Sequence, residues 1–414
     1  MDVAKYQSEL KWVASQRDRM LHLIESWANC NTGSDNLKGL NQMVSILKQA
    51  FEPLGTCTLH SLPERLTINE LGETISAPIA PALTVRGGDP EGQGPKVLLS
   101  GHMDTVFSIK SGFQTCRYEG ENRLIGPGVI DLKGGLVLML IALEALNRSE
   151  WAHSLSWQVV VNPDEEVGSV SSTSLLTQLA HGQDVALVFE PPYPDGTMVS
   201  ERKGSANYAI HAKGKAAHAG RAFHEGLNAI TALSRVLVSI DGLNSIQKDI
   251  TVNIGTIRGG EAANIVPDRA VAQVGIRAST TKHMELIESK MSDIVQHANE
   301  QGKATITLQQ LSYRPPKSFN RETKHLFECL QSCAQKLKQK VTWQSSGGVC
   351  DGNTLAAAGV PVIDTLGAPG GAIHTDQEYL SVNELVPRAQ LVTLYLLTLA
   401  SRAWTPLSQE GKNQ

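Results

Sequence analysis

Short apolar runs alternate with longer segments that favour helices over roughly the first 203 residues of the chain. The longer segments predict helices at 4–29, 36–52 and 134–148. The apolar runs predict strands at 82–86, 96–100, 157–162 and 185–189. Most of these strands are continuous Val- and Leu-rich runs without regular polar alternation, which is typical of a sheet buried on both faces. The pattern therefore predicts an α/β fold.

The pattern changes at about residue 204. Residues 206–213 alternate between apolar and polar positions, which predicts a half-exposed strand. The next elements are predicted to be helix, strand, strand, helix and strand, at 227–240, 250–258, 269–279, 282–301 and 304–311. This β-α-β-β-α-β order is that of a split βαβ, or ferredoxin-like, α+β sandwich, in which helices cover one face of a sheet.

The α/β pattern resumes at Arg314. It predicts a helix at 322–339, a strand at 361–366 and an apolar closing helix at 384–403. A chain of 414 residues is too long for one ordinary core, so we interpret 1–203 and 314–414 as one discontinuous domain. Residues 204–313 would then be a domain of ordinary size inserted into it.

Composition and charge exclude several classes of function. The net charge is −4 and the isoelectric point is near 6.3, so the chain has no electrostatic footprint for nucleic acid or an anionic membrane. No apolar run approaches the length of a membrane span, and the N-terminal segment lacks the regions of a signal peptide. We therefore expect a cytoplasmic protein. The six cysteines are scattered without a CxxC pair and are expected to be reduced thiols.

A run of three acids interrupts the otherwise apolar pattern. The strand predicted at 157–162 runs almost directly into Asp164, Glu165 and Glu166. Crowded like charges are costly unless a positive group neutralises them. For these three residues alone, a solvated turn with an acidic helix N-terminus is an equally good interpretation.

Further titratable side chains follow the other predicted strands of the α/β domain or lie in their loops. They are His102 with Asp104, Asp131, Glu190 and His374. In open α/β sheets, ligands bind outside the carboxyl ends of the strands. Imidazole and carboxylate are the groups that hold hard-to-borderline divalent metal ions. The sequence therefore predicts a metal site at this edge, and the three acids make sense if cations lie beside them.

At this point the chain resembles the M20 metallopeptidases, which are dinuclear zinc amidohydrolases, and in particular their carboxypeptidase G2-like branch of glutamate carboxypeptidases. The resemblance runs from the N-terminal helix to the last helix. It rests on these motifs in order: "GHMDTV", "GPGVIDLKGG", "DEEVGS", "FEP", "KAAHAG", "ANIVPD", "GVCDGN" and "IHTDQEYL". It implies a zinc-peptidase-like, doubly wound mixed sheet with an inserted lid or dimerisation domain.

The resemblance implies two Zn²⁺ ions per subunit, with Co²⁺ or Mn²⁺ as possible substitutes. Asp131 resembles the carboxylate that bridges the two ions. His102 and Glu190 look like ligands of one ion, and Glu166 and His374 look like ligands of the other. Two metals together lower the pKa of a water and polarise the scissile carbonyl.

The resemblance also implies which residues do the chemistry. Glu165 looks like the general base and acid, which takes a proton from water and passes it to the leaving amine. Asp104 would accept the second ring N–H of His102 and fix its tautomer. His218 would reach the active site of a neighbouring subunit and stabilise the oxyanion, which implies a homodimer formed through the inserted domain.

Three residues are expected on the substrate side. Asn264 resembles a family residue that helps to hold the substrate. Arg277 and Arg314 match positions that grip a terminal carboxylate, a task that suits the guanidinium fork. For Arg314, a surface position at the domain junction is an equally good interpretation.

Four other residues have a functional and a structural interpretation. Cys350 stands where a small hydroxyl residue is common in the family, and it either contacts substrate or is a buried inert thiol. Asp376 lies close to His374 but is also explained as a solvated loop acid. His211 alternates within a strand and is interpreted as structural, and His224 is a weaker candidate that loop solvation also explains.

The leading hypothesis is a zinc-dependent hydrolase that cleaves an amide bond next to a free carboxylate. Its substrate would be a small acyl- or peptidyl-amino acid, with glutamate as one candidate for the leaving group. An N-acyl-amino-acid deacylase of the acetylornithine deacetylase type would use the same metals and base. A catalytically silent metal-binding scaffold is a third possibility, against which an intact Glu165 argues, because binding alone needs no general base.

Overall fold

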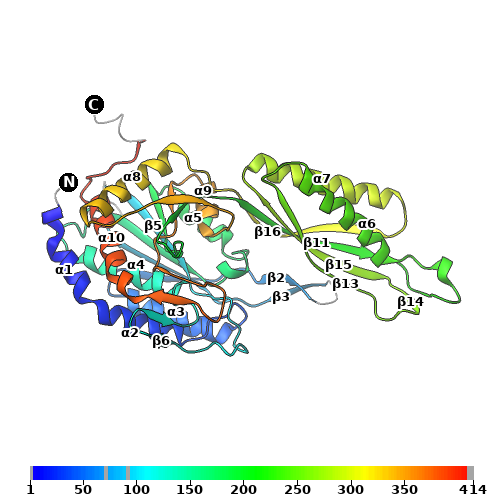
Figure 1. Ribbon diagram of the computed structural model, residues 1–414, viewed down its shortest axis with the longest axis horizontal. Coiled ribbons are helices and arrows are strands. Elements are labelled where there is room, and N and C mark those ends of the chain that lie inside the picture. Colours follow the sequence, from blue (N-terminus) through cyan, green and yellow to red (C-terminus); the bar gives the residue numbers. More distant parts are fainter. Residues whose placement is uncertain (1–2, 70–72, 90–93, 408–414) are drawn as a thin grey trace.

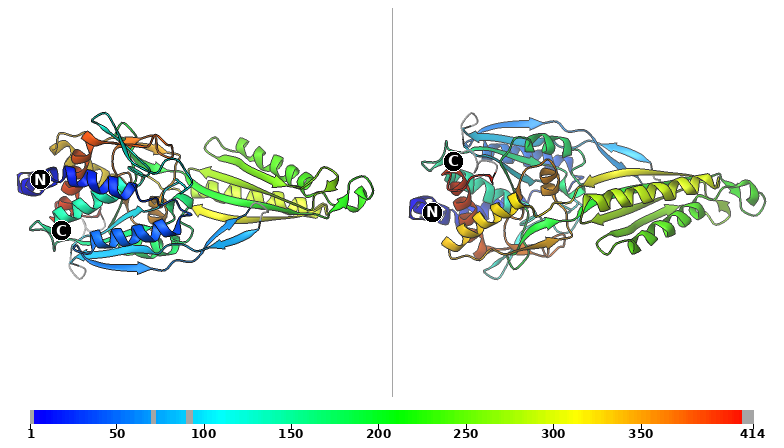
Figure 2. Two further views of the ribbon diagram at one scale, coloured as in Figure 1. Left: turned by 90° about the horizontal axis from the view of Figure 1, so that it is seen from below. Right: turned by 90° about the horizontal axis from the view of Figure 1, so that it is seen from above.

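A computed structural model describes residues 3–69, 73–89 and 94–407, which form a broad body and a narrower unit that projects from it (Figures 1 and 2). The described part of the body contains a six-stranded sheet. Its strands, in spatial order, are β1 (Thr56–His60), β4 (Ala82–Gly88), β8 (Ser156–Asn162), β5 (Lys96–His102), β9 (Val185–Val188) and β18 (Val362–Ile363). Strands β8, β5, β9 and β18 run parallel, whereas β1 and β4 pair antiparallel. The predicted mixed α/β sheet is confirmed, and β1 is an edge strand that the apolar pattern did not predict.

Helices bury both faces of this sheet. On one face, α3 (Leu37–Phe51), α4 (Lys133–Asn147) and α8 (Arg321–Lys336) contact the strands, and α1 (Gln7–Ser15), α2 (Arg17–Ala28) and α10 (Val382–Ala400) pack against α4. The other face packs under α5 (Thr173–Ala180) and α9 (Asp351–Ala357). Within β5, Val97 and Leu99 join the first core, while Leu98 joins the second. Because both faces need apolar side chains, the strand reads as a continuous apolar run.

The single helix predicted at 4–29 is wrong. The segment is a 3-10 turn, η1 (Val3–Tyr6), followed by α1 and α2, which are separate helices that meet at Gln16. The backbone N–H of Gln16 bonds to the carbonyl of Val13, which tightens the end of α1, and its own carbonyl accepts from Met20 to begin α2. The apolar periodicity continues across the break, so periodicity alone could not reveal it.

The projecting unit has its own sheet and its own core. The strand order is β13 (Thr251–Gly259), β15 (Arg269–Ala278), β11 (Gly204–Lys213) and β16 (Thr305–Arg314), with all neighbours antiparallel. Helices α6 (Ala229–Asp241) and α7 (Thr281–Glu300) pack against one face and share a separate apolar cluster with it. The predicted β-α-β-β-α-β order is confirmed. The division of the chain at 203/204 and 313/314 stays our interpretation.

A bulge in β16 decides which of its side chains face away from the helices. Asn207 of β11 pairs with Ser312, but the next residue, Tyr208, pairs with Gln310, so Leu311 is the extra residue. Without this shift, Arg314 would lie on the same face as Ile306, which belongs to the core under the helices. With it, Arg314 lies on the helix-free face.

Short elements connect these layers or lie at the edges. They are the strands β2 (Arg65–Ile68), β3 (Thr74–Ala77), β6 (Arg117–Glu119), β7 (Arg123–Ile125), β10 (Met198–Arg202), β12 (Ala217–His218), β14 (Ile265–Val266), β17 (Trp343–Ser346), β19 (Gly370–Gly371) and β20 (Tyr379–Ser381), and the 3-10 turns η2 (Glu165–Val167), η3 (Phe223–Glu225) and η4 (Gly242–Ser245). The β2–β3 arm reaches toward the projecting unit (Figure 1), where Thr74 Oγ1 donates to Gln309 Oε1 at 3.3 Å.

Two predictions from composition agree with the described residues. All six cysteines are free thiols. Within the described ranges, the helices are all too short or too polar to cross a membrane.

Candidate metal centre

One group of side chains that could bind a metal ion gathers at the carboxyl end of β5. His102 is the last residue of β5, Asp131 lies just before α4, and Glu190 follows β9. His102 Nε2 is 3.1 Å from Asp131 Oδ1 and 3.7 Å from Glu190 Oε1. All three side chains are buried, and their possible ligand atoms lie within 4.8 Å of one another.

A second group shares Asp131 with the first. His374 Nε2 is 3.3 Å from Asp131 Oδ2 and 3.3 Å from Glu166 Oε2. The possible ligand atoms of these three residues also lie within 4.8 Å of one another, and the two oxygens of Asp131 face different imidazoles. The structure thus brings together all five predicted metal ligands, in two sets that meet at one carboxylate.

The donor set fits two divalent cations. Oε1 of Glu166 and Oε1 of Glu190 are buried without a hydrogen-bond partner among the described residues, which is costly unless a cation lies nearby. Hydrogen bonds to Asp131 and Glu166 raise the pKa of His374 to about 10. Burial opposes the charge of Asp131, but His102 and His374 still hold the pKa of that carboxyl well below its ordinary value. A metal bound here would displace the imidazole protons, as metal binding to histidine requires.

Asp104 lies behind the first group. His102 Nδ1, on the side of the ring away from Asp131, lies 3.1 Å from the backbone carbonyl oxygen of Asp104 and 3.3 Å from its Oδ1. The same carboxylate accepts the backbone N–H groups of Glu165 and Glu166, both at 3.1 Å, and the hydroxyl of Ser34 at 2.9 Å. Asp104 therefore connects the imidazole of His102 to the segment that carries Glu165 and Glu166.

Glu378 is a buried carboxylate that the sequence analysis did not single out. It accepts the backbone N–H groups of Gly128, Ile130 and Asp131 at 3.2, 3.0 and 3.2 Å, and so fixes the loop that carries the shared ligand. Burial raises the pKa of Glu378 to about 8. Its only sequence signal is an acid four residues beyond His374, because its partners are backbone groups far away in the chain.

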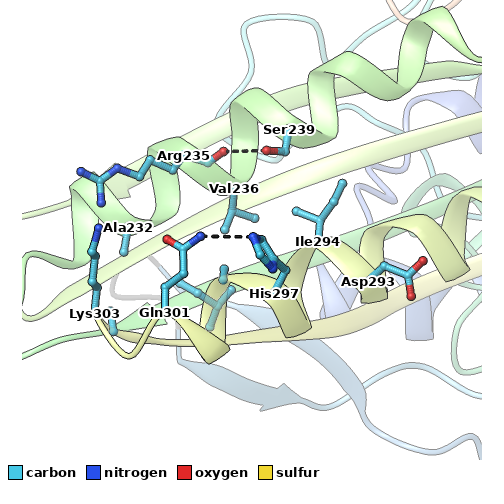
Figure 3. Close-up of a pocket in the computed structure, with 12 residues that line it drawn as sticks. Ala232, Arg235, Val236, Ser239, Asp293, Ile294, His297, Gln301 and Lys303 are labelled. Carbon is cyan, nitrogen blue, oxygen red and sulfur yellow. Dashed lines mark hydrogen bonds between the residues drawn. The ribbon is translucent and has the colours of Figure 1, made fainter.

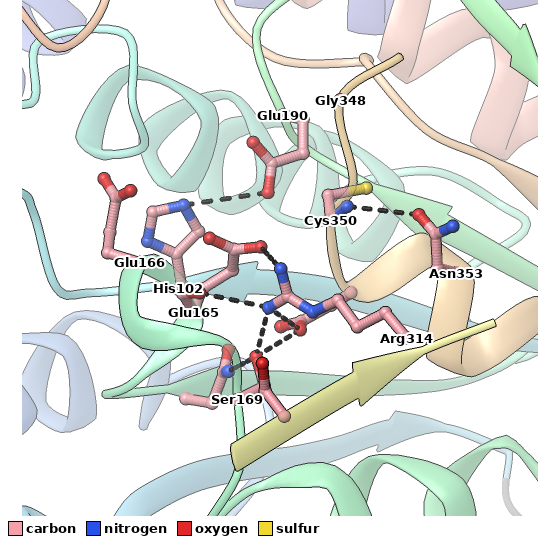
Figure 4. Close-up of polar contacts among 12 residues, drawn as sticks. His102, Glu165, Glu166, Ser169, Glu190, Arg314, Gly348, Cys350 and Asn353 are labelled. Carbon is pink, nitrogen blue, oxygen red and sulfur yellow. Dashed lines mark hydrogen bonds and ion pairs between the residues drawn. The ribbon is translucent and has the colours of Figure 1, made fainter. Parts of the chain in front are cut away.

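Glu165 lies beside the two metal-binding groups and contacts the end of β16 (Figure 4). Its Oε1 is 2.8 Å from Nη1 of Arg314, in a buried ion pair. Burial raises the pKa of Glu165 to about 8, although the charge of Arg314 acts in the opposite direction. Arg314 is only 6% exposed, so the interpretation as a surface residue is wrong.

The cleft beside Glu165, Glu166 and His374 has two lobes, which share the segment at Gly348 and Val349. One lobe of about 390 Å³ is mainly apolar and is lined by the turn at 191–194 together with Ile130, Val199 and Ile373. The other, also about 390 Å³, is more polar than the first, and its lining includes Ser205, Asn207, Arg277, Ser312 and Arg314. If the amide bond of a substrate lay at Glu165, the two parts of the substrate would occupy lobes of different polarity.

Arg277 lines the polar lobe with an unused donor. Its Nη1 is buried and has no hydrogen-bond partner among the described residues. Burial lowers the pKa of Arg277, and so does the charge of Arg314. The guanidinium is therefore available to an anion that enters this lobe.

His218 and Asn264 do not join these residues. His218 lies in β12, and Asn264 directly precedes β14, at the far end of the projecting unit (Figures 1 and 2). The two are neighbours there, because β12 pairs with β14 and the N–H of Ala219 bonds to the carbonyl of Asn264. Both side chains are exposed.

The structure also shows where the four residues with both a functional and a structural interpretation lie. Cys350 is buried at the start of α9 and does not line either lobe. Asp376 is exposed, as a solvated loop acid would be, and His211 is half-buried within β11. His224 is exposed in η3.

A separate groove of about 300 Å³ lies between α6 and α7 of the projecting unit (Figure 3). Apolar residues such as Val236 and Ile294 form its floor, and Arg235, His297 and Lys303 lie along its rim. None of the predicted site residues lines it.

Comparison with known proteins identifies the family of this chain. Residues 98–398 match the protein family described as peptidase family M20/M25/M40. The chain is 26% identical over 396 residues to carboxypeptidase G2 of Pseudomonas sp. (strain RS-16), covering 93% of this chain and 90% of that protein. It is 25% identical over 356 residues to the uncharacterized protein YqjE of Bacillus subtilis (strain 168), covering 85% of this chain and 91% of that protein.

Solved structures share the fold. An M20 family metallo-carboxypeptidase of Sulfolobus solfataricus superposes with a TM-score of 0.73 at 15% identity, over 92% of this chain and 99% of that one. A tripeptidase of Staphylococcus aureus superposes with a TM-score of 0.72 at 24% identity, over 93% and 99%. The family match covers well over half of the chain. The protein is therefore a hydrolase of the metal-dependent peptidase family M20/M25/M40.

Proposed function

We propose that this protein uses two zinc ions to hydrolyse an amide bond next to a free carboxylate, as a carboxypeptidase of small acyl- or peptidyl-amino acids. The observation that carries the proposal is the pair of three-residue groups that share Asp131, with Glu165 beside them. Co²⁺ or Mn²⁺ would substitute for Zn²⁺, because imidazole and carboxylate ligands suit all three.

Each residue of the centre has a defined task. His102, Asp131, Glu166, Glu190 and His374 would hold the metal ions. When bound, the ions supply Lewis-acid polarisation of the amide carbonyl and make a water more acidic. Glu165 takes a proton from that water as it attacks the carbonyl carbon, and passes the proton to the nitrogen as the C–N bond breaks. Asp104 holds the orientation of His102 and of the Glu165 segment.

The two lobes of the cleft support the choice of substrate. The unpaired Nη1 of Arg277 suits the carboxylate of the released amino acid, because a charge-assisted hydrogen bond would satisfy both groups. The apolar lobe suits the acyl side, since it offers aliphatic and proline surface with few polar atoms.

We further propose a homodimer in which each site borrows His218 and Asn264 from the partner subunit. Both residues lie at the far end of the projecting unit, away from the metal-binding groups of their own chain (Figure 1). A two-fold contact between projecting units is a common way for such a surface to close. His218 would then donate a hydrogen bond to the oxyanion of the tetrahedral intermediate.

A panel of substrates tests the proposal. The zinc-loaded protein is assayed with N-acetyl- and N-benzoyl-amino acids and with dipeptides, each as the free acid and as the matching C-terminal carboxamide. We expect hydrolysis of free acids and at least about tenfold lower kcat/KM for carboxamides, because the carboxamide lacks the charge that Arg277 would bind. Preference for acetyl over larger acyl groups would favour the deacylase alternative. Equal rates for acids and carboxamides would contradict recognition of a free carboxylate.

A further inference from the structure

We propose that Arg314 is a positioning residue for the base Glu165, and not a ligand of the substrate carboxylate. This inference rests on the proposed function, because it takes Glu165 as the base. It replaces the role expected for Arg314 from the sequence, and it leaves Arg277 as the arginine that receives the substrate carboxylate.

The guanidinium of Arg314 holds Glu165 at two points (Figure 4). Nη1 lies 2.8 Å from the carboxylate oxygen Oε1 of Glu165, and Nη2 donates to the backbone carbonyl of the same residue at 3.0 Å. A planar fork that contacts both the side chain and the backbone of one residue restricts the rotation of that side chain. A general base must be held in this way if it is to meet its proton within hydrogen-bond distance.

Two further residues hold the guanidinium itself. Nη2 of Arg314 also donates to Ser169 Oγ at 2.7 Å and to Asp351 Oδ1 at 3.2 Å. The Ser169 hydroxyl donates in turn to Asp351, so the three side chains form a closed network. Arg314 is buried within this network. To release its fork to a substrate, it would have to leave two buried carboxylates without their cation, which is strongly unfavourable.

The two arginines of the polar lobe occupy equivalent positions in the strand register, but they differ in their contacts with carboxylates. Arg277 of β15 and Arg314 of β16 both lie opposite Ser205 of β11, so the three side chains form a row across adjacent strands. The bulge at Leu311 brings Arg314 onto this face. Only Arg314 is neutralised by protein carboxylates, whereas Nη1 of Arg277 has no partner among the described residues. The guanidinium of Arg314 is thus paired with protein carboxylates, whereas that of Arg277 is available to bind an anion.

The position of Arg314 in the chain has a mechanical consequence. It is the last residue of β16, the strand that leads from the projecting unit back into the body, whereas Glu165 and Asp351 belong to the body. The ion pair therefore ties the placement of the base to the placement of the projecting unit.

The first test separates kcat from KM. Arg314→Gln is expected to lower kcat about 10- to 100-fold with KM for N-benzoyl-L-glutamate within about threefold of wild type, because a base displaced by about an ångström loses rate and not binding. Arg314→Lys keeps the charge but not the fork, so its kcat should lie between those of wild type and Arg314→Gln. Arg277→Gln should show the opposite pattern, with KM raised at least about tenfold.

The second test distinguishes positioning from general destabilisation. Arg314→Gln is combined with Glu165→Gln, and residual turnover, metal content and the melting temperature are measured. If Arg314 acts through Glu165, the double variant should turn over no more slowly than Glu165→Gln alone. If the two substitutions together lower turnover by the product of their separate effects, Arg314 acts independently of the base and the proposal is overturned.

The third measurement is binding, and it does not depend on turnover. In the slow Glu165→Gln background, the dissociation constant of N-benzoyl-L-glutamate should change less than about threefold on Arg314→Gln and should rise at least about tenfold on Arg277→Gln. Equal weakening by both changes would make Arg314 a substrate ligand and contradict the inference.

A gentler variant covers the case in which Arg314→Gln does not fold. Ser169→Ala removes one acceptor of the network without leaving a charge unpaired, and it should lower kcat a few-fold at unchanged KM. Wild-type kcat in Ser169→Ala together with a raised KM would count against positioning. If instead Glu165→Gln retains normal turnover, it is the proposed function that fails, and this outcome is visible before Arg314 is changed.

Discussion

The carboxylate of Asp104 accepts the backbone N–H of Glu165 at 3.1 Å, while the same oxygen lies 3.3 Å from Nδ1 of His102. The backbone carbonyl of Asp104 lies 3.1 Å from the same Nδ1, so Asp104 holds both the imidazole of the proposed ligand His102 and the backbone of the proposed base Glu165. In Asp104→Asn, an amide N–H would face one of these donors, so we expect kcat/KM to fall about 10- to 100-fold, the usual cost of losing such a partner. Steady-state kinetics and metal analysis check this, and an unchanged kcat/KM would contradict it.

The proposed metal ligands are tested by the metal content of variants and not by their turnover. His102→Ala and His374→Ala should each lose metal relative to wild type, because each belongs to a different group around Asp131. Elemental analysis after dialysis provides the measurement. His153→Ala, an exposed histidine in a loop before β8, is the matched control and should keep the wild-type content. If both ligand variants also retain the wild-type content, the assignment is wrong.

Removal of the metal should be reversible. A chelator should abolish hydrolysis of the best panel substrate, and added Zn²⁺ or Co²⁺ should restore it, because the five ligands would still be in place. Activity that persists in protein shown by elemental analysis to be free of metal would exclude the proposed chemistry.

Arg277 should control affinity for the carboxylate of the substrate. Arg277→Gln is expected to raise KM for free acids at least about tenfold and to leave the slower carboxamides nearly unaffected, since only the acids carry the charge. The comparison of the two substrate series is the measurement. Arg235→Gln, an exposed arginine on α6, serves as control. A similar loss for acids and carboxamides would show that Arg277 acts on the fold of the lobe.

Subunit mixing tests the shared site. Glu165→Gln and His218→Ala are each expected to be nearly inactive as homodimers. After subunit exchange, a heterodimer holds one site with an intact Glu165 on the His218→Ala chain and an intact His218 from its partner, so activity should return. If exchange is demonstrated by mass labelling and no activity returns, His218 does not act across subunits.

Local patterns predicted most of the fold, for identifiable reasons. Strand β5 must fill two cores, so its continuous apolar run is visible in the sequence. In β11, Tyr208 and Ile210 face the helices while Asn207 does not, and this alternation is visible too. The break at Gln16 was not predictable, because the apolar periodicity continues through it.

The gathering of imidazoles and carboxylates was predictable, because parallel strands deliver their ends to one edge of the sheet. The choice of five ligands among these side chains came from the family resemblance. The residues that position these side chains were not predictable. Glu378 binds backbone groups some 250 residues away in the chain, and Arg314 reaches Glu165 only because of the bulge at Leu311. Neither contact leaves a periodic or spaced signal in the sequence, since each depends on packing between distant segments.

The most direct test of the proposed chemistry is the turnover of Glu165→Gln, measured together with its metal content. Glu165 lies beside both metal-binding groups without belonging to either. We expect the variant to hold two metal ions per subunit, as we expect for wild type, and to have a kcat lower by about 10²- to 10⁴-fold, the usual contribution of general acid–base catalysis. Glu52→Gln, an exposed acid just after α3, should match wild type in both measurements. A fully metallated Glu165→Gln protein with near-normal kcat would show that Glu165 is not the base.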